Sequence, residues 1–274
     1  MKNFCICTLT DGRELRDEFL KYTVKTFMDN WREDSFEWFI LINIPSDKTK
    51  EVVDWIQLEY PQITWHIHYS EVNLGPGGGI NRLNELSKGY EYSLFLEGDW
   101  VTLPNNISGF SDNWISNSIK LLEDHPHIDQ VQFRRYLNDA DDRAYGFSEW
   151  IQKENIESIV DNGDRFYLLK NRQYVNTPTL RRMSSYYEKG IFPLDEFWDE
   201  NGNPTEVKGN SNWGMAEINA AQKPLTGAWL EFGNFVHYEN WPYRDRWQEW
   251  IDKKHGCRED LSGLNSCKYG FALP

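Results

Sequence analysis

Short apolar runs alternate with longer segments of helical period through the first third of the chain. The apolar runs predict buried strands at residues 4–8, 38–44, 63–69 and 92–96. The segments between them predict helices at residues 13–31, 46–60 and 80–88. This alternation is typical of a layered α/β fold, in which helices flank a largely parallel sheet. We therefore expect an α/β protein.

Local signals support the first two of these helices. One apolar face of the first helix is made by residues that are mostly three or four apart: Leu15, Phe19, Tyr22 and Phe27. Ser46 precedes the second helix and is a residue type that caps helix starts. Pro61 follows the second helix and cannot continue it.

The pattern continues in the rest of the chain with less regular spacing. Helices are predicted at residues 114–123, 179–189, 213–222 and 243–255. Strands are predicted at residues 130–134, 165–170 and 229–237, with a polar loop at 138–148.

Charge and hydropathy exclude several classes of protein. The net charge is −14 and no run of Lys and Arg forms a basic stripe, which excludes a nucleic-acid partner. The apolar run at the amino terminus is too short for a signal peptide, and no stretch approaches the roughly 18 apolar residues of a membrane span. We expect a cytoplasmic protein without a transmembrane segment. Its four cysteines are expected to be reduced thiols: Cys5, Cys7, Cys257 and Cys267.

An acidic turn follows the strand predicted at residues 92–96. Glu97 and Asp99 are separated by a single glycine, so both carboxylates can turn toward one point. In an open α/β sheet, ligands bind outside the carboxyl ends of the strands. Carboxylate oxygens are the ligands that Mg²⁺ and Mn²⁺ prefer, and such a cation bridges the oxygens of a diphosphate. The turn is therefore a candidate metal site.

A glycine-rich loop precedes this turn by about twenty residues. Residues 73–79 read Asn-Leu-Gly-Pro-Gly-Gly-Gly and lead into a predicted helix, whose first backbone N–H groups favour phosphate. No Gly-Lys-Ser/Thr follows, so the loop is not a Walker A sequence. Ile80 and Arg82 stand where the third glycine of a dinucleotide fingerprint would fall, which disfavours that class too.

Together these segments resemble the family 2 glycosyltransferases. The resemblance rests on residues 73–75 (Asn-Leu-Gly), 79–81 (Gly-Ile-Asn) and 90–100 (YEYSLFLEGDW), where a strand runs into a DXD-type turn. It implies a GT-A fold, which is a Rossmann-like fold of nucleotide-diphospho-sugar transferases. The expected catalytic domain covers residues 1–242, with a nucleotide-sugar-binding half at 1–104 and an acceptor half at 105–242. Residues 243–274 are expected to form a helical extension.

The resemblance also assigns residues to the donor. Residues 8–13 (Thr-Leu-Thr-Asp-Gly-Arg) are similar to the nucleotide-contacting start of these families. This similarity implies that Thr8, Thr10 and Arg13 lie against the nucleotide and its diphosphate. Asn43 falls where these folds place a polar residue against the base.

The glycine-rich loop and the acidic turn complete the implied donor and metal site. Gly79, Asn81 and Arg82 are the expected donor contacts from the loop and the helix after it. Glu97 stands where Asp is usual, so Asp99 is the stronger candidate ligand for Mn²⁺ or Mg²⁺. The implied donor is a UDP-, GDP- or dTDP-linked sugar, and the acceptor is a hydroxyl of a glycan or another molecule.

The later part of the chain supplies the remaining candidates. Residues 212–218 resemble the Trp-Gly-x-Glu-Asp element that carries the general base of inverting families, which makes Glu217 the candidate base. The alignment needs a one-residue shift, because Ala216 replaces the first acid. Asp195 is the reserve candidate, and His237 resembles the late histidine that completes the metal or diphosphate contact.

Two other functions remain open from the sequence. A sugar nucleotidyltransferase also uses an acidic metal site, although residues 7–13 are poor in the glycine that such enzymes place after the first strand. Aromatic residues make up 15% of the chain, which fits a non-catalytic carbohydrate-binding protein because flat rings suit sugar surfaces. The chain lacks the repeats and regular short strands of lectin sandwiches and propellers.

Overall fold

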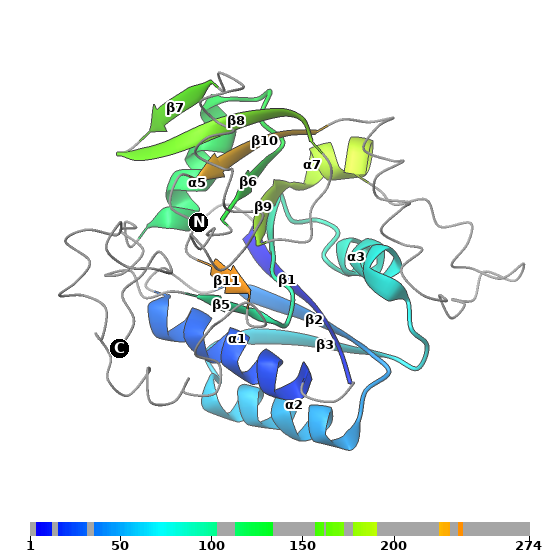
Figure 1. The fold of residues 1–274 in the computed structure, drawn as a ribbon. Coiled ribbons are helices and arrows are strands. Elements are labelled where there is room, and N and C mark those ends of the chain that lie inside the picture. The colour runs from blue at the N-terminus through cyan, green and yellow to red at the C-terminus, as the bar shows by residue number, and fades with distance from the viewer. Residues whose placement is uncertain are drawn as a thin grey trace, which may run out of the picture.

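The structure is a computed structural model, and nine strands of the chain form one twisted sheet (Figure 1). It describes residues 4–12, 16–31, 36–102, 113–133, 157–161, 163–172, 178–190, 225–230 and 235–237. The strand order in this sheet is β3-β2-β1-β4-β9-β6-β10-β8-β7, and β11 pairs with β5 in a second, two-stranded sheet. Within the main sheet only β9 and β8 run against the other strands, so the sheet is mainly parallel.

The first part of the chain alternates strand and helix, as its pattern predicts. The elements are β1 (Phe4–Asp11), α1 (Arg16–Asn30), β2 (Glu37–Asn43), α2 (Asp47–Glu59), β3 (Thr64–Ser70), α3 (Gly75–Leu86) and β4 (Tyr92–Phe95). Strands β3, β2, β1 and β4 are parallel neighbours. Their carboxyl ends therefore meet at one edge of the sheet.

The second part of the chain completes the sheet and adds short elements beside it. These elements are β5 (Trp100–Thr102), α5 (Trp114–Asp124), β6 (Gln130–Gln132), β7 (Ser158–Asp161), β8 (Asp164–Arg172), β9 (Thr179–Arg182), α7 (Met183–Ser185), the π-helix η1 (Tyr186–Gly190), β10 (Leu225–Leu230) and β11 (Phe235–His237). No helix in this described part of the chain, or in the first part, has the length and apolar character needed to cross a membrane.

Helices cover both faces of the parallel strands (Figure 1). On one face, α1 and α2 pack Leu20, Phe27 and Val53 against Ile6 and Trp38 in a large apolar cluster. On the opposite face, α3 closes a smaller cluster of buried residues, which includes Cys7, Leu9, Phe39, Ile80 and Leu83. Strands buried on both faces explain why β1 and β2 read as nearly continuous apolar runs.

The predicted cap of the second helix is confirmed. The Ser46 side chain accepts a hydrogen bond from the Thr49 N–H at 3.1 Å, and the Thr49 hydroxyl accepts one from the Ser46 N–H at 3.3 Å. This reciprocal arrangement satisfies backbone donors that have no partner within the helix. The helix ends at Glu59, two residues before Pro61.

The helix predicted at residues 179–189 is wrong for its first four residues. Thr179–Arg182 form β9, which lies antiparallel between β4 and β6. The first three of these residues have cross-strand partners on both sides, and Leu180 is fully buried between Leu94 and Val131. Tertiary pairing overrides the local helical pattern here. The helical part that follows, α7 with η1, begins only at Met183.

Other elements also differ from the predicted ones. Helix α3 begins at Gly75 and not at residue 80, because Pro76 fits the first turn, where its missing N–H costs nothing. The strand predicted at 229–237 is two strands in different sheets, β10 and β11. Strands β5 and β7 have no counterpart in the prediction. The elements predicted at 138–148, 213–222 and 243–255 lie outside the described residues, as do residues 104 and 242, where the expected domain boundaries fall.

Candidate functional site

The acidic turn lies where the strand order reverses. Strand β1 has β2 and then β3 on one side and β4 on the other, so the switch point falls between β1 and β4. After β4 ends, the Leu96 N–H donates to the Cys7 carbonyl at 2.9 Å and the Gly98 N–H donates to the Leu9 carbonyl at 3.0 Å. The turn at Glu97 is thus fixed along the end of β1. Its place agrees with the ligand-binding edge expected from the sequence.

Gly98 allows the turn to approach β1 closely. A Cβ atom added at Gly98 would lie 2.7 Å from the Thr10 Oγ1 and 2.8 Å from the Thr10 Cβ. Real side chains do not approach so closely, so the turn and Thr10 fit together only with glycine at this position. Thr10 is buried at 8% exposure and forms the surface against which the turn packs.

Asp99 carries the buried carboxylate of the turn. The residue is 7% exposed, and its Oδ2 accepts a hydrogen bond from Nη1 of Arg16, the first residue of α1. A carboxylate withdrawn from water requires a positive partner, because its own hydration has been lost. Glu97 is half-buried two residues earlier. The turn thus presents one buried and one more accessible carboxylate.

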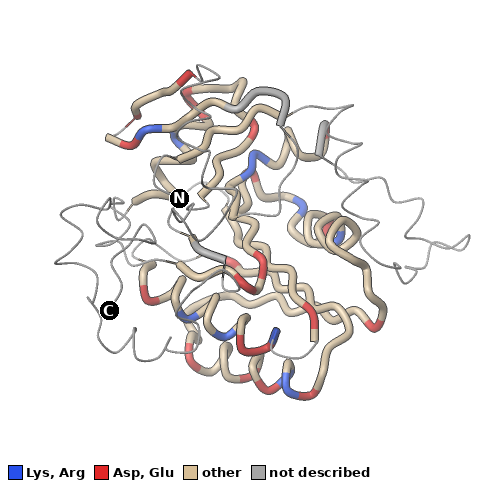
Figure 2. Tube along the Cα trace, viewed as in Figure 1, with Lys and Arg blue, Asp and Glu red and all other residues tan. Residues whose placement is uncertain are grey.

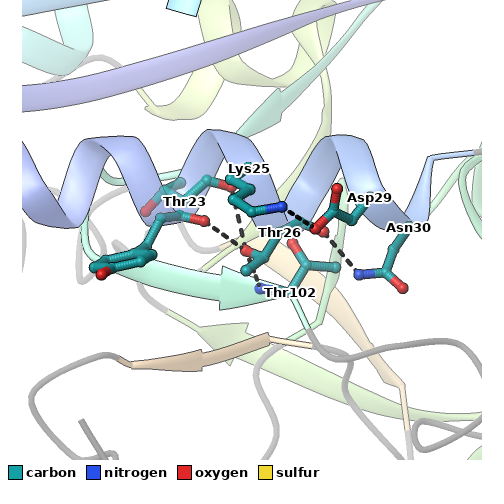
Figure 3. Close-up of polar contacts among 7 residues, drawn as sticks. Thr23, Lys25, Thr26, Asp29, Asn30 and Thr102 are labelled. Atoms are coloured by element: carbon teal, nitrogen blue, oxygen red, sulfur yellow. Dashed lines mark hydrogen bonds and ion pairs between the residues drawn. The ribbon is translucent and has the colours of Figure 1, made fainter. Parts of the chain in front are cut away.

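A threonine of α1 fixes the strand that follows the turn (Figure 3). The Thr26 Oγ1 accepts a hydrogen bond from the Thr102 N–H of β5 at 3.1 Å and donates to the Tyr22 carbonyl at 2.8 Å. Asn30 Nδ2 donates to the Thr26 carbonyl at 2.7 Å. Helix α1 therefore holds the segment around the turn at two points, through Arg16 at Asp99 and through Thr26 at β5.

His237 lies beside the acidic turn although it is far away in the sequence. Strand β11 is antiparallel to β5, and His237 is the partner of Trp100, which directly follows Asp99. The backbone thus places the predicted third ligand next to the two predicted carboxylates. The position of the His237 side chain is outside the described part of the chain.

The donor chemistry of the turn fits a divalent cation. Carboxylate oxygens of Glu97 and Asp99 are hard ligands of the kind that Mn²⁺ and Mg²⁺ prefer. Asp99 already lies against a positive group, the Arg16 guanidinium, so this position suits a cation. Among the side chains that the structure describes, no group of three His, Cys, Asp or Glu is arranged to hold a metal ion. The third ligand stays a prediction.

The ends of β1 and β2 form a second part of the same edge. The Gly12 N–H donates to the Asn43 carbonyl at 2.9 Å, and a Cβ at Gly12 would lie 2.1 Å from the Ile44 carbonyl oxygen. Asn43 is 5% exposed, and its Oδ1 accepts from the Leu74 N–H at 3.5 Å. Ile44 has a φ of 48°, which is costly for a β-branched residue, and it is 46% exposed. Strained backbone of this kind concentrates at functional sites.

Helix α3 places the predicted loop residues on the other face of the sheet. A Cβ at Gly79 would lie 2.6 Å from the Leu9 Cδ1, so this glycine allows α3 to approach β1. Asn81 is 5% exposed, and its Oδ1 accepts a hydrogen bond from the Tyr186 hydroxyl at 2.8 Å. Burial raises the pKa of Tyr186, which keeps this donor protonated. Arg82 pairs with Glu85 of the same helix at 3.0 Å.

A buried arginine extends this polar region beneath α3. Arg181 of β9 is 2% exposed, and its Cζ lies 4.3 Å from the centre of the Phe95 ring. Burial lowers the pKa of Arg181 to about 9, because a charged group loses its hydration there. Gln130 and Gln132 of β6 are also buried.

Two of the predicted site residues lie in β1 and not in a loop after it. Thr8 and Thr10 both belong to the strand, which extends to Asp11. Thr8 is fully buried, and its Oγ1 accepts a hydrogen bond from the Trp38 Nε1 at 2.9 Å. Thr10, two residues further along the same face, reaches the acidic turn.

The structure therefore joins part of the predicted site. It brings Thr10, Glu97, Asp99 and the backbone of His237 together, and it places Asn43 on the same edge. Arg13, Asp195 and Glu217 lie outside the described residues.

Sequence reasoning missed Arg16. A signal for it exists, because a basic residue in the first turn of a helix opposes the helix dipole and needs another reason to be there.

The chain has the GT-A fold of glycosyltransferases. No protein-family model matches its sequence, and no curated protein matches it either. Similar solved structures include S. aureus TarS 1–349 in complex with UDP-GlcNAc, which is 13% identical with a TM-score of 0.53 over 86% of this chain and 58% of that one. GalNAc-T7 with UDP, GalNAc and Mn²⁺ is 10% identical with a TM-score of 0.55 over 100% of this chain and 52% of that one.

A third similar structure is that of a mannosyltransferase. The mannosyltransferase PcManGT from Pyrobaculum calidifontis, in complex with GDP-Man and Mn²⁺, is 11% identical with a TM-score of 0.50 over 77% of this chain and 56% of that one. This chain thus spans between half and three fifths of the length of these three proteins.

Proposed function

We propose that this chain is a divalent-cation-dependent glycosyltransferase. It transfers a sugar from a nucleotide-diphosphate donor to a hydroxyl group of a glycan or another acceptor. The observation that carries this proposal is the buried Asp99 at the switch point of a GT-A fold, held against a cationic side chain. The similar structures support it, because their names record UDP-GlcNAc, GDP-Man and Mn²⁺.

Asp99 and Glu97 are the proposed oxygen ligands of Mn²⁺ or Mg²⁺, with His237 as the third. A divalent cation bound there supplies positive charge that stabilises the departing nucleoside diphosphate. Thr10 fixes the position of the turn by direct packing. The Trp38–Thr8 hydrogen bond holds β1 to β2 below that contact, which keeps the two strand ends in register.

The donor nucleotide is proposed to lie along the ends of β1 and β2. Thr8, Thr10 and Arg13 come from the first strand and the residues after it, and Asn43 offers a polar group from the second. Gly79, Asn81 and Arg82 are the proposed contacts from α3. The donor is a UDP-, GDP- or dTDP-linked sugar.

Glu217 is the proposed general base, with Asp195 as the alternative. The base removes the proton from the acceptor hydroxyl as the oxygen attacks the anomeric carbon, and the bond from that carbon to the diphosphate oxygen breaks. Attack from the side opposite the leaving group gives inversion. Such a base contributes about 10² to 10⁴ in rate.

Product analysis separates this function from its two alternatives. Incubation with UDP-, GDP- and dTDP-sugars and Mn²⁺ is expected to release the nucleoside diphosphate from one donor, by transfer to an added glycan or slowly to water. Release of pyrophosphate from a nucleoside triphosphate and a sugar phosphate would instead identify a nucleotidyltransferase. Neither product, together with binding of glycans, would identify a carbohydrate-binding protein.

The base assignment has its own control. Glu217→Gln is expected to lower turnover about 100-fold or more while nucleotide affinity stays within twofold. Asp195→Asn is the matched variant and is expected to keep most of the activity. The opposite result for the two variants would move the base to Asp195.

A further inference from the structure

We propose that Arg16 competes with the divalent cation for Asp99 and is released toward the donor when the cation binds. The inference rests on the proposed function, because it concerns the same carboxylate. It adds a residue that the motif at Glu97 does not include, and it makes binding of the cation and of the nucleotide interdependent.

The Arg16 guanidinium balances the charge of the Asp99 carboxylate. The Asp99 side chain is 10% exposed, and the Arg16 guanidinium that contacts it is 29% exposed. A carboxylate this far from water requires a counter-charge, and Arg16 supplies it. The contact thus compensates the charge of Asp99 and holds the turn in place before any cation arrives.

Arg16 does not stabilise the start of helix α1 through the helix dipole. A cation at a helix amino terminus lies against the positive end of the dipole. The next two residues, Asp17 and Glu18, supply the acidic first turn that a helix favours. Lys48 pairs with the Asp17 Oδ2 at 3.0 Å. Arg16 is therefore held by Asp99, which lies outside the helix, and its Cζ also lies 5.6 Å from the centre of the Phe19 ring within the helix.

A divalent cation and the Arg16 guanidinium exclude each other from the Asp99 carboxylate. A divalent cation bound to Asp99 would share one carboxylate with a guanidinium, and the two positive groups would repel each other at close range. The cation is more strongly charged, so the guanidinium leaves the carboxylate. When the cation binds without nucleotide, the Arg16–Asp99 contact is lost. This loss lowers the affinity of the nucleotide-free protein for the cation.

The released guanidinium binds the phosphate oxygens of the donor. Its fork of N–H groups matches the oxygens of a phosphate, and it starts from the same edge of the sheet. A nucleoside diphosphate then supplies the negative charge that Arg16 has lost. The cation and the nucleotide consequently strengthen each other's binding, because each removes a cost of the other.

The test measures Mn²⁺ binding to the full chain without nucleotide. Arg16→Gln removes the competing charge but keeps a polar side chain of similar length, and it is expected to bind Mn²⁺ about fivefold more tightly than wild type. With saturating Mn²⁺, the same variant is expected to bind UDP or GDP about tenfold more weakly, because a charge-assisted contact is lost. Calorimetry measures both affinities, and the electron paramagnetic resonance of free Mn²⁺ checks the first.

Two further variants keep the test decisive. Lys120→Gln removes an exposed positive charge of α5, where Lys120 pairs with Asp124, and is expected to leave the Mn²⁺ affinity of the free protein unchanged. Arg16→Lys retains the charge without the fork and is expected to bind Mn²⁺ like wild type but the nucleotide more weakly. If thermal unfolding shows that the glutamine variant does not fold, Arg16→Met replaces it as the uncharged test variant, with the same expected results.

The outcomes separate the inference from the proposed function. Equal or weaker Mn²⁺ binding by Arg16→Gln overturns the competition, as does undetectable binding by both proteins. If wild type binds neither UDP, GDP nor dTDP, the proposed function fails. Tighter Mn²⁺ binding by Arg16→Gln would still support the competition at Asp99 in that case.

Discussion

The two faces of the parallel strands bury different kinds of side chain. Beneath α1 and α2 lies the larger apolar cluster, which is rich in rings and includes Phe27 and Trp38. Beneath α3 the apolar cluster is smaller, and Asn81 and Arg181 are buried beside it. Residues of both charge signs occur along α1 and α2 (Figure 2). The two clusters thus differ in size and in the polar side chains that are buried beside them.

The difference shows which face positions the acidic turn. Thr10, Arg16 and Thr26, which contact the turn or the strand after it, all lie on the α1 side. A rigid apolar layer therefore supports the proposed metal ligands. The α3 face buries Asn81 and Arg181, and burial of such groups is costly unless they are hydrogen-bonded. Substitutions on the two faces should have different consequences.

The largest effect is expected from truncating the aromatic centre of the α1 face. Phe27 is 1% exposed and lies within ring contact of Trp31, Phe36, Trp38, Trp114 and Phe235. Phe27→Ala is expected to lower the free energy of unfolding by about 3–5 kcal/mol, because it loses these contacts and leaves a cavity. Urea denaturation measures the change.

Leu58→Ala is the control for this variant. Leu58 is 81% exposed on α2, so its truncation should change stability by less than about 0.5 kcal/mol. A loss below about 1 kcal/mol for Phe27→Ala would mean that the α1 face is not the main source of stability.

An intermediate effect is expected at the junction between the apolar face and the turn. Gly98→Ala places a Cβ against Thr10 and is expected to cost about 1–3 kcal/mol, because turn and strand must separate. It should also weaken Mn²⁺-dependent nucleotide binding by moving Asp99. Thermal unfolding and calorimetry measure the two effects.

Gly227→Ala is the matched control on the α3 face. A Cβ at Gly227 would have its nearest neighbours, side-chain atoms of Gln130 and Gln132, at 3.6–3.7 Å, which is ordinary contact. This variant should change neither stability by more than about 0.5 kcal/mol nor nucleotide binding. Equal effects of the two alanines would contradict the close fit at Gly98.

The smallest effect is a pH dependence on the α3 face. Glu37 of β2 has a lowered pKa, mainly through a hydrogen bond from Tyr90 and then through one with His66, at 2.5 Å. A lowered pKa in the folded state means that the stabilisation is present above the unfolded value of about 4.3 and is lost as pH falls through the folded value. Because the Glu37 side chain is 40% exposed, the effect is small.

Glu37→Gln tests this dependence. The variant should lose part of the decline in stability that wild type shows as the pH falls below about 4.3. Denaturant unfolding at a series of acidic pH values measures the slope. Identical slopes in the two proteins would remove Glu37 from the acid response.

The sequence alone predicts the β1–α1–β2–α2–β3 order and the acidic turn because their signals are local. Ser46 and Thr49 form their cap within one helical turn, and apolar runs mark the buried strands. Strand β9 could not be predicted in this way, since its extended form depends on β4 and β6 at both sides.

The contacts that build the site are also non-local. Arg16 and Asp99 are 83 residues apart, and His237 reaches the turn only through the pairing of β11 with β5. The residue types of the acidic turn predict which side chains bind a cation. Arg16, which contacts Asp99, belongs to another element, and only the fold shows that α1 brings it there.

The central claim is that Asp99 holds a divalent cation needed for nucleotide binding. Calorimetric titration of UDP, GDP and dTDP into the protein, with and without Mn²⁺, tests it most directly, with Asp99→Asn as the variant and Asp124→Asn of an exposed ion pair as the control. We expect one nucleotide to bind at least about tenfold more tightly with Mn²⁺, and we expect Asp99→Asn alone to abolish that gain. Binding that ignores Mn²⁺, or a gain that survives in Asp99→Asn, would contradict the account.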